Sequence, residues 1–143
     1  RRRGLNVACA RVVATGAAYA ARRMLHHVSL EVFPDQIERT LEFWSLLGFT
    51  EVPPAPQPLH GRVNWVERDG TQIHLIHAEE PAVPARGHVA VVTPNIEEVV
   101  ARLAAAGFEV EPKRELWGAR RAGAVAPGGH RVELMEAPPP AAT

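Results

Sequence analysis

An internal repeat constrains the fold of this chain more than any other feature of its sequence. Residues 26–52 (HHVSLEVFPDQIERTLEFWSLLGFTEV) and 87–110 (GHVAVVTPNIEEVVARLAAAGFEV) each read as an alternating strand, a turn with proline, a helix, a Gly-Phe pair and another strand. Residues 62–77 and 121–136 then each show two strands around a glycine-containing turn, which is typical of a β-hairpin. Gly48 lies 26 residues before His74, and Gly107 lies 26 residues before Glu133. The repeat therefore keeps its register over the second half of each unit.

The repeat predicts an α+β fold of two tandem βαβββ modules. We expect the modules at about 24–77 and 87–136 of a domain spanning 24–137, with 78–86 as the linker and 138–143 as a tail. Two capping boxes, Asp35 with Glu38 and Asn95 with Glu98, mark the expected helix starts. Gly48 and Gly107 stand where each helix needs a left-handed residue to end.

Charge and cysteine content narrow the possible functions. Residues 1–23 contain six arginines and no acidic residue, so residues 24–143 carry ten basic and sixteen acidic residues, a balance of 10 − 16 = −6. An acidic body without a basic stripe argues against nucleic-acid binding. Cys9 is the only cysteine, which favours a reducing compartment, and no apolar run could span a bilayer. We therefore expect a cytoplasmic protein.

The Arg-rich segment 1–23 has two interpretations. It could be a transit peptide or a poor signal peptide, since it is rich in arginine and alanine and has no acid. We favour the interpretation that it is upstream sequence outside the domain, because an ordered strand pattern begins directly at Met24.

Strand alternation sorts the polar residues onto one face of the predicted sheets. In each strand one set of alternate residues is mainly apolar and is expected to pack on the helices. The opposite, open face then holds four ligand-type residues: His27, His74, His88 and Glu133. In the repeat His27 is equivalent to His88, and His74 to Glu133. Each residue alone would be an ordinary structural or surface residue, but the paired equivalence indicates a shared site.

Three imidazoles and a carboxylate are suitable ligands for a divalent first-row metal, and four protein ligands leave coordination positions for a substrate. The sequence therefore predicts a metal site at His27, His74, His88 and Glu133. The remaining histidines and the tryptophans are expected to be structural. His26 and His77 have the wrong parity, His60 and His130 fall in loops or turns, Trp44 is expected in a helix core, and Trp65 and Trp117 in a pocket wall or core.

Four segments resemble a known superfamily. HHVSLEV, LEFWSLLGF, GHVAVV and PGGHRVELME, in this order, are similar to recurring elements of the vicinal oxygen chelate group, which contains glyoxalases, bleomycin-resistance proteins and extradiol dioxygenases. The resemblance covers Met24 to about Ala137. It implies that the modules form a cup-shaped mixed sheet with the helices outside and a divalent metal at the four residues above. It also implies a homodimer whose site is built from modules of two chains, or an equivalent arrangement within one chain.

One position departs from the resembled pattern. Bacterial glyoxalase I typically has a glutamate where this chain has His74, and the related epimerases have a glutamine. A histidine keeps metal binding possible but removes a carboxylate that could share proton transfer. The metal implied by such a site is nickel, cobalt, zinc, manganese or iron, and the ligands alone do not choose among them.

Three functions remain open at this stage. The first is a glyoxalase-like lyase or isomerase of a small-molecule substrate, with Glu133 as both ligand and base and with Arg120, Arg121 or Arg131 as candidates to hold an anionic group. The second is a non-haem iron dioxygenase of the extradiol type that uses His27, His88 and Glu133. The third is a non-catalytic protein that sequesters a drug or metabolite in the cup.

Overall fold

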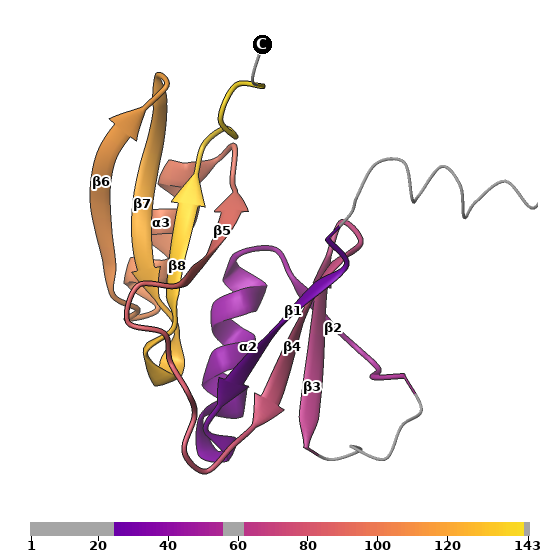
Figure 1. Cartoon of the computed structure of the whole chain (residues 1–143). Helices are drawn as coiled ribbons and strands as arrows, with labels where there is room; N and C mark the ends of the chain where they lie inside the picture. Colours follow the sequence, from indigo (N-terminus) through magenta and orange to yellow (C-terminus); the bar gives the residue numbers. More distant parts are fainter. Residues whose placement is uncertain (1–24, 56–61, 142–143) are drawn as a thin grey trace, which may run out of the picture.

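The computed structural model describes residues 25–55 and 62–141, which form two four-stranded mixed sheets and two α-helices (Figure 1). Sheet A has the strand order β1-β4-β3-β2 and sheet B the order β5-β8-β7-β6. The strands of sheet A are β1 (His27–Val32), β2 (Thr50–Val52), β3 (Val63–Arg68) and β4 (Thr71–His77). Those of sheet B are β5 (His88–Val92), β6 (Val110–Leu116), β7 (Ala119–Val125) and β8 (Arg131–Met135). The α+β class and the two tandem βαβββ modules are confirmed.

The two sheets repeat each other in strand register as well as in strand order. In each sheet the first and last strands run parallel and the hairpin strands run antiparallel. His74 pairs with Ser29, two residues after His27, and Glu133 pairs with Ala90, two residues after His88. The equivalence inferred from sequence spacing is therefore present in the backbone pairing.

Both helices begin differently from the capping-box prediction. A short 3₁₀ turn, η1 (Pro34–Gln36), precedes α2 (Ile37–Leu46), so Asp35 lies before the helix and no side chain caps it. The N-cap of α3 (Ile96–Ala105) is Asn95, as predicted, but its amide bonds to the Glu98 carboxylate, 3.2 Å away, instead of capping a backbone N–H. The first cap was misplaced because the proline fixes a tighter turn ahead of the α-helix.

Both helices end as the sequence predicts. Gly48 and Gly107 have φ angles of +84° and +77°, a conformation that costs glycine little. The amide of Gly48 donates to the carbonyl of Ser45 and that of Phe49 to the carbonyl of Trp44; Gly107 and Phe108 make the equivalent pair of bonds. This is the Schellman pattern, in which the glycine lets the chain turn back and the following phenylalanine enters the core.

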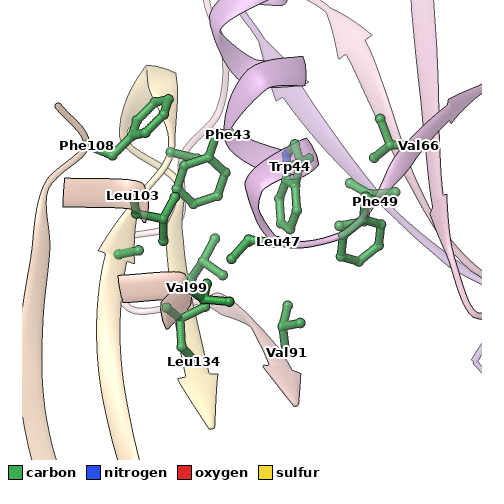
Figure 2. Packing of buried hydrophobic residues seen from close by; sticks show 14 of the residues in the cluster. Phe43, Trp44, Leu47, Phe49, Val66, Val91, Val99, Leu103, Phe108 and Leu134 are labelled. Atoms are coloured by element: carbon green, nitrogen blue, oxygen red, sulfur yellow. The ribbon is translucent and has the colours of Figure 1, made fainter. Parts of the chain in front are cut away.

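One apolar core serves both modules (Figure 2). Phe43 and Trp44 of α2 are fully buried, and the Phe43 ring meets the edge of Phe108, with ring centroids 5.2 Å apart. Leu103 of α3 and Leu134 of β8 are also fully buried in this cluster. Because α2 contributes to a core that includes sheet B residues, the modules are packed against each other and not merely linked.

Polar side chains also join the modules. The guanidinium of Arg68, at the end of β3, donates to the carbonyl of Leu47 (2.9 Å) and to that of Val92 in β5 (3.0 Å). The His130 ring, which follows η2 (Pro127–Gly129), donates from Nε2 to the carbonyl of Glu31 in β1, 2.6 Å away. These bonds fix the start of β8 and the end of β5 relative to the first module.

Each sheet has an open edge beside its predicted ligands. Among the described residues, β1 pairs only with β4 and β5 pairs only with β8, so one side of each strand has no neighbouring strand. We expected one cup-shaped sheet. The described residues instead form two separate open sheets. In Figure 1, α2 lies between the two sheets and α3 behind sheet B, and both pack on faces opposite the predicted ligands.

Two segments that the sequence analysis discussed are not described by the structure. The segment 1–23, with Cys9, and the loop containing His60 lie outside the described residues. Within residues 25–55 and 62–141, neither helix is long and apolar enough to cross a membrane.

Candidate metal centre

The first half of the candidate site is a column of three rings on the open face of sheet A. The His27 and His74 rings are stacked, with centroids 4.1 Å apart and planes 10° from parallel. On its other side the His74 ring stacks on the Trp65 indole at 4.0 Å and 2°. The contact with Trp65 follows from the β3–β4 hairpin, in which Trp65 pairs directly with His74. The structure therefore brings His27 and His74 together.

The His74 imidazole is neutral at neutral pH. Burial, followed by the nearby His27 and His26, lowers the pKa of His74 from 6.5 to about 4. A neutral imidazole has a lone pair available for a metal ion. Its Nε2 lies 2.9 Å from Gln72 Oε1, so a neutral ring that donates there keeps the lone pair on Nδ1.

The second half of the site is a direct contact on the open face of sheet B. His88 Nε2 lies 3.0 Å from Glu133 Oε2. The other carboxylate oxygen of Glu133 accepts a hydrogen bond from Arg121 Nε at 2.5 Å. This bond is the main reason that the pKa of Glu133 is lowered, and burial partly opposes it. Glu133 is therefore an anion at neutral pH, as a metal ligand must be.

The donor atoms of sheet B fit one first-row ion. Two ligands at right angles and about 2.1 Å from a metal lie about 3.0 Å apart, which matches the His88–Glu133 contact. His88 Nδ1 lies 3.2 Å from the Arg86 carbonyl, and a bond from Nδ1–H would leave the Nε2 lone pair facing the carboxylate. In sheet A the imidazole donors suit the same kind of ion, and the His27 and His74 rings lie nearly parallel, 4.1 Å apart.

The two pairs stay separate within the described part of one chain. No group of three or more His, Cys, Asp or Glu side chains in residues 25–55 and 62–141 is arranged to hold a metal ion. Each sheet thus holds two of the four predicted ligands, and all four could meet only if a sheet A and a sheet B faced each other.

The residues that the sequence assigned to structural roles divide into two groups. His77 bonds to Asn64 Oδ1 at 2.8 Å, on the face away from His74, and Trp44 is fully buried, both as expected. Trp117 differs from expectation, because it lies exposed in the β6–β7 turn with φ of +43°. His130 lies after a turn, as expected, but it is buried and joins the modules.

The structure also separates the three candidate arginines. Arg120 lies on the face of sheet B that packs against α3, and it pairs with Glu97 and Glu136. Its hydrogen bonds lower the pKa of Glu136 to about 2. Arg121 is on the open face but is engaged by Glu133. Arg131 has no carboxylate within ion-pair distance among the described residues, although its charge helps to lower the pKa of Glu111. The sequence already shows glutamates on the strand that neighbours these arginines. Only the strand register shows which arginine each glutamate contacts.

The open face of sheet B carries a cavity of about 580 Å³ that includes His88, Glu133 and Arg121. A second cavity, of about 480 Å³, lies between α3 and β6; its lining mixes apolar residues with charged ones such as Glu97 and Arg120, and it includes none of the four predicted ligands. The chemistry is therefore expected on the open face.

Paired βαβββ modules whose equivalent strands carry ligand-type residues on their open faces define the vicinal oxygen chelate class of folds. The sequence model of the Glyoxalase/Bleomycin resistance protein/Dioxygenase superfamily matches residues 24–134. The chain belongs to this superfamily.

Solved structures agree on the fold. A glyoxalase family protein from Enterococcus faecalis is 23% identical, with a TM-score of 0.63 over 80% of this chain and 98% of that one. Oxidase ChaP-H2 is 18% identical, with a TM-score of 0.64 over 82% and 95%. TnmS3, an antibiotic binding protein from Streptomyces sp. CB03234, is 24% identical, with a TM-score of 0.63 over 80% and 95%. A search of curated proteins finds no match. These neighbours differ in activity, so they show the fold alone.

Proposed function

We propose that this protein is a divalent-metal-dependent lyase or isomerase of the glyoxalase type, acting on a small molecule. The observation that carries the proposal is the pairing of ligand-type residues at equivalent register positions: His27 beside His74, and His88 beside Glu133. Chance would not readily give both sheets such a pair on the open face. His27, His74, His88 and Glu133 would together hold the ion.

We further propose that two chains assemble the site. The ligand pairs stay apart among the described residues of one chain, and β1 and β5 both have an open edge. Open edges are surfaces that proteins usually cover. A two-fold homodimer would cover both and set His27 and His74 of one protomer opposite His88 and Glu133 of its partner, giving two equivalent sites.

The chain's own residues supply the proton transfer. A bound divalent ion would polarise a substrate oxygen and so acidify the neighbouring C–H bond. The Glu133 carboxylate, kept ionised by Arg121, accepts the proton from that carbon. Arg121 holds one oxygen of the carboxylate, and the other oxygen lies beside His88 Nε2. The Trp65 ring limits the movement of His74.

Glu133→Gln tests this role. We expect the variant to bind Ni²⁺ at saturating metal but to lose at least about 10²-fold in the rate of deuterium exchange at the carbon next to the carbonyl of 2-oxoaldehyde or thioester substrates. The exchange is followed by proton NMR in D₂O. Glu38→Gln, an exposed position on α2 without a contact in the described structure, is the matched control and should leave both properties unchanged.

Metal binding is tested separately with histidine variants. His74→Ala should weaken Ni²⁺ binding, whereas His77→Ala, on the same strand but the opposite face, should not. Metal content and calorimetric titration give the comparison. If the wild-type protein binds no Ni²⁺, Co²⁺, Zn²⁺, Mn²⁺ or Fe²⁺, the enzyme proposal is wrong, and a metal-free binding function takes its place.

One observation favours a second candidate, an iron-dependent dioxygenase of the extradiol type. His74 Nε2 is engaged by Gln72 and its ring is held between Trp65 and His27. If His74 stays there, His27, His88 and Glu133 form the two-histidine, one-carboxylate set that suits non-haem iron. Oxygen uptake with Fe²⁺ and a catechol that survives His74→Ala would support this candidate over the first.

A further inference from the structure

The cavity on the open face of sheet B contains two guanidinium groups without an ion-pair partner. Its lining includes four cationic residues, of which Lys113 pairs with Glu111 and Arg121 with Glu133. Arg86 and Arg131 also line it, and no carboxylate of the described residues lies within ion-pair distance of either. Glu109 is the one lining carboxylate outside these pairs. The uncompensated charge of the cavity is therefore positive, although the domain is acidic.

These two arginines stand beside the candidate metal ligands. Arg131 pairs in register with His88 across the parallel β5–β8 ladder. It precedes Glu133 by two residues on the same face of β8, a separation of roughly 7 Å along the strand. The carbonyl of Arg86 lies 3.2 Å from the His88 ring, so the backbone at Arg86 is fixed against the same residue. Arg131 and Glu133 therefore line the same cavity, about two strand residues apart.

We infer that Arg131, with Arg86, binds a carboxylate or phosphate group of the substrate. That the anion belongs to a substrate rests on the proposed function, but the anion site itself uses residues other than the metal ligands. A guanidinium can hold a planar or tetrahedral anion by two parallel hydrogen bonds. The anion would sit beside Glu133 and direct the rest of the molecule toward the His88–Glu133 contact. Arg121 does not take this role, because it holds Glu133.

The test measures binding of benzoate and of its neutral counterpart benzamide to the full chain freed of metal by chelation. We expect the wild-type protein to bind benzoate about tenfold more tightly than benzamide, since a hydrogen bond to a charged group is worth about 1.5–3 kcal/mol. Chemical shifts of the backbone amides give both affinities, which can be in the millimolar range. The largest benzoate shifts should fall at Arg131 and His88.

Arg131→Gln should remove the preference for benzoate, and Arg131→Lys should keep part of it because the charge remains. Arg114→Gln is the matched control: it makes the same charge change on sheet B, but Arg114 lies outside this cavity. The inference is overturned if benzoate and benzamide bind equally to the wild-type protein, or if Arg131→Gln and Arg114→Gln bind benzoate equally well.

Nickel titration of the same variants separates this inference from the proposed function. We expect Arg131→Gln to bind Ni²⁺ as the wild-type protein does. If the wild-type protein binds benzoate through Arg131 but binds no metal, the anion site stands and the enzyme proposal falls. If it binds metal but shows no preference for benzoate, the enzyme proposal stands and the anion site falls.

Discussion

At the scale of single residues, His74 shows how far a sequence can define a site. Strand parity placed it correctly beside His27, on the face opposite His77. The stacking of His74 on Trp65 could also have been predicted from the sequence. The two-residue turn at Asp69 and Gly70 pairs residues whose numbers sum to 139, which puts Trp65 opposite His74. The low pKa of His74 could not be predicted, because it depends on burial and on the ring contacts in three dimensions.

The lowered pKa of His74 predicts a pH-dependent loss of stability. In the unfolded chain this histidine has a pKa near 6.5, whereas in the folded metal-free protein it is about 4. Between these values the unfolded state binds a proton that the folded state does not, so the free energy of unfolding should fall as pH decreases from 6.5 to 4. Below pH 4 this contribution should change no further.

Chemical denaturation at several pH values measures this effect. His74→Phe keeps a flat ring against Trp65 but cannot be protonated, so its stability should vary less between pH 6.5 and 4 than that of the wild-type protein. His77→Phe, on the opposite face of β4, is the control. Its free energy of unfolding should vary with pH as that of the wild-type protein does. Equal slopes for the wild-type protein and His74→Phe would show that His74 has an ordinary pKa in the folded state.

At the scale of strands and helices, the sequence predicted the elements well and their starts less well. Each glycine helix end was right because only glycine adopts φ near +80° at little cost, so the residue itself marks the position. The start of α2 was wrong because Pro34 begins a 3₁₀ turn that takes up Asp35, the expected cap residue. The bridging role of His130 could not be predicted, because its partner Glu31 lies 99 residues away.

His130 predicts how strongly the modules are held together. Its ring is 6% exposed and donates to the Glu31 carbonyl at the end of β1. His130→Ala removes this part-buried hydrogen bond together with a buried ring, which should lower the free energy of unfolding by about 1–3 kcal/mol. Urea denaturation gives the value. His26→Ala, at an exposed histidine, should change stability by less than about 0.5 kcal/mol. A loss for His130→Ala no larger than that of the control would mean that the module contact does not depend on this bond.

At the scale of the whole molecule, the repeat determines the architecture and leaves the assembly open. The two βαβββ modules and their open faces follow from the repeated pattern, and the structure adds the same strand order in both sheets. The relative placement of the two sheets does not, because it depends on how Phe43, Phe108 and Leu103 pack in the shared core. That packing keeps the His27–His74 pair and the His88–Glu133 pair in separate groups among the described residues. A metal centre from all four residues would therefore need a sheet A and a sheet B brought face to face, as in the proposed dimer.

Complementation between two inactive variants tests the shared metal centre most directly. One variant carries His27→Ala and His74→Ala, and the other carries His88→Ala and Glu133→Ala. Neither homodimer should bind Ni²⁺ at this site. In a mixed dimer, sheet A of one chain and sheet B of the other are both intact, so the isolated mixed dimer should bind about one Ni²⁺, against about two in the wild-type dimer. A mixed dimer that binds no more Ni²⁺ than either homodimer, or a wild-type protein that binds Ni²⁺ as a monomer, would contradict a site shared between two chains.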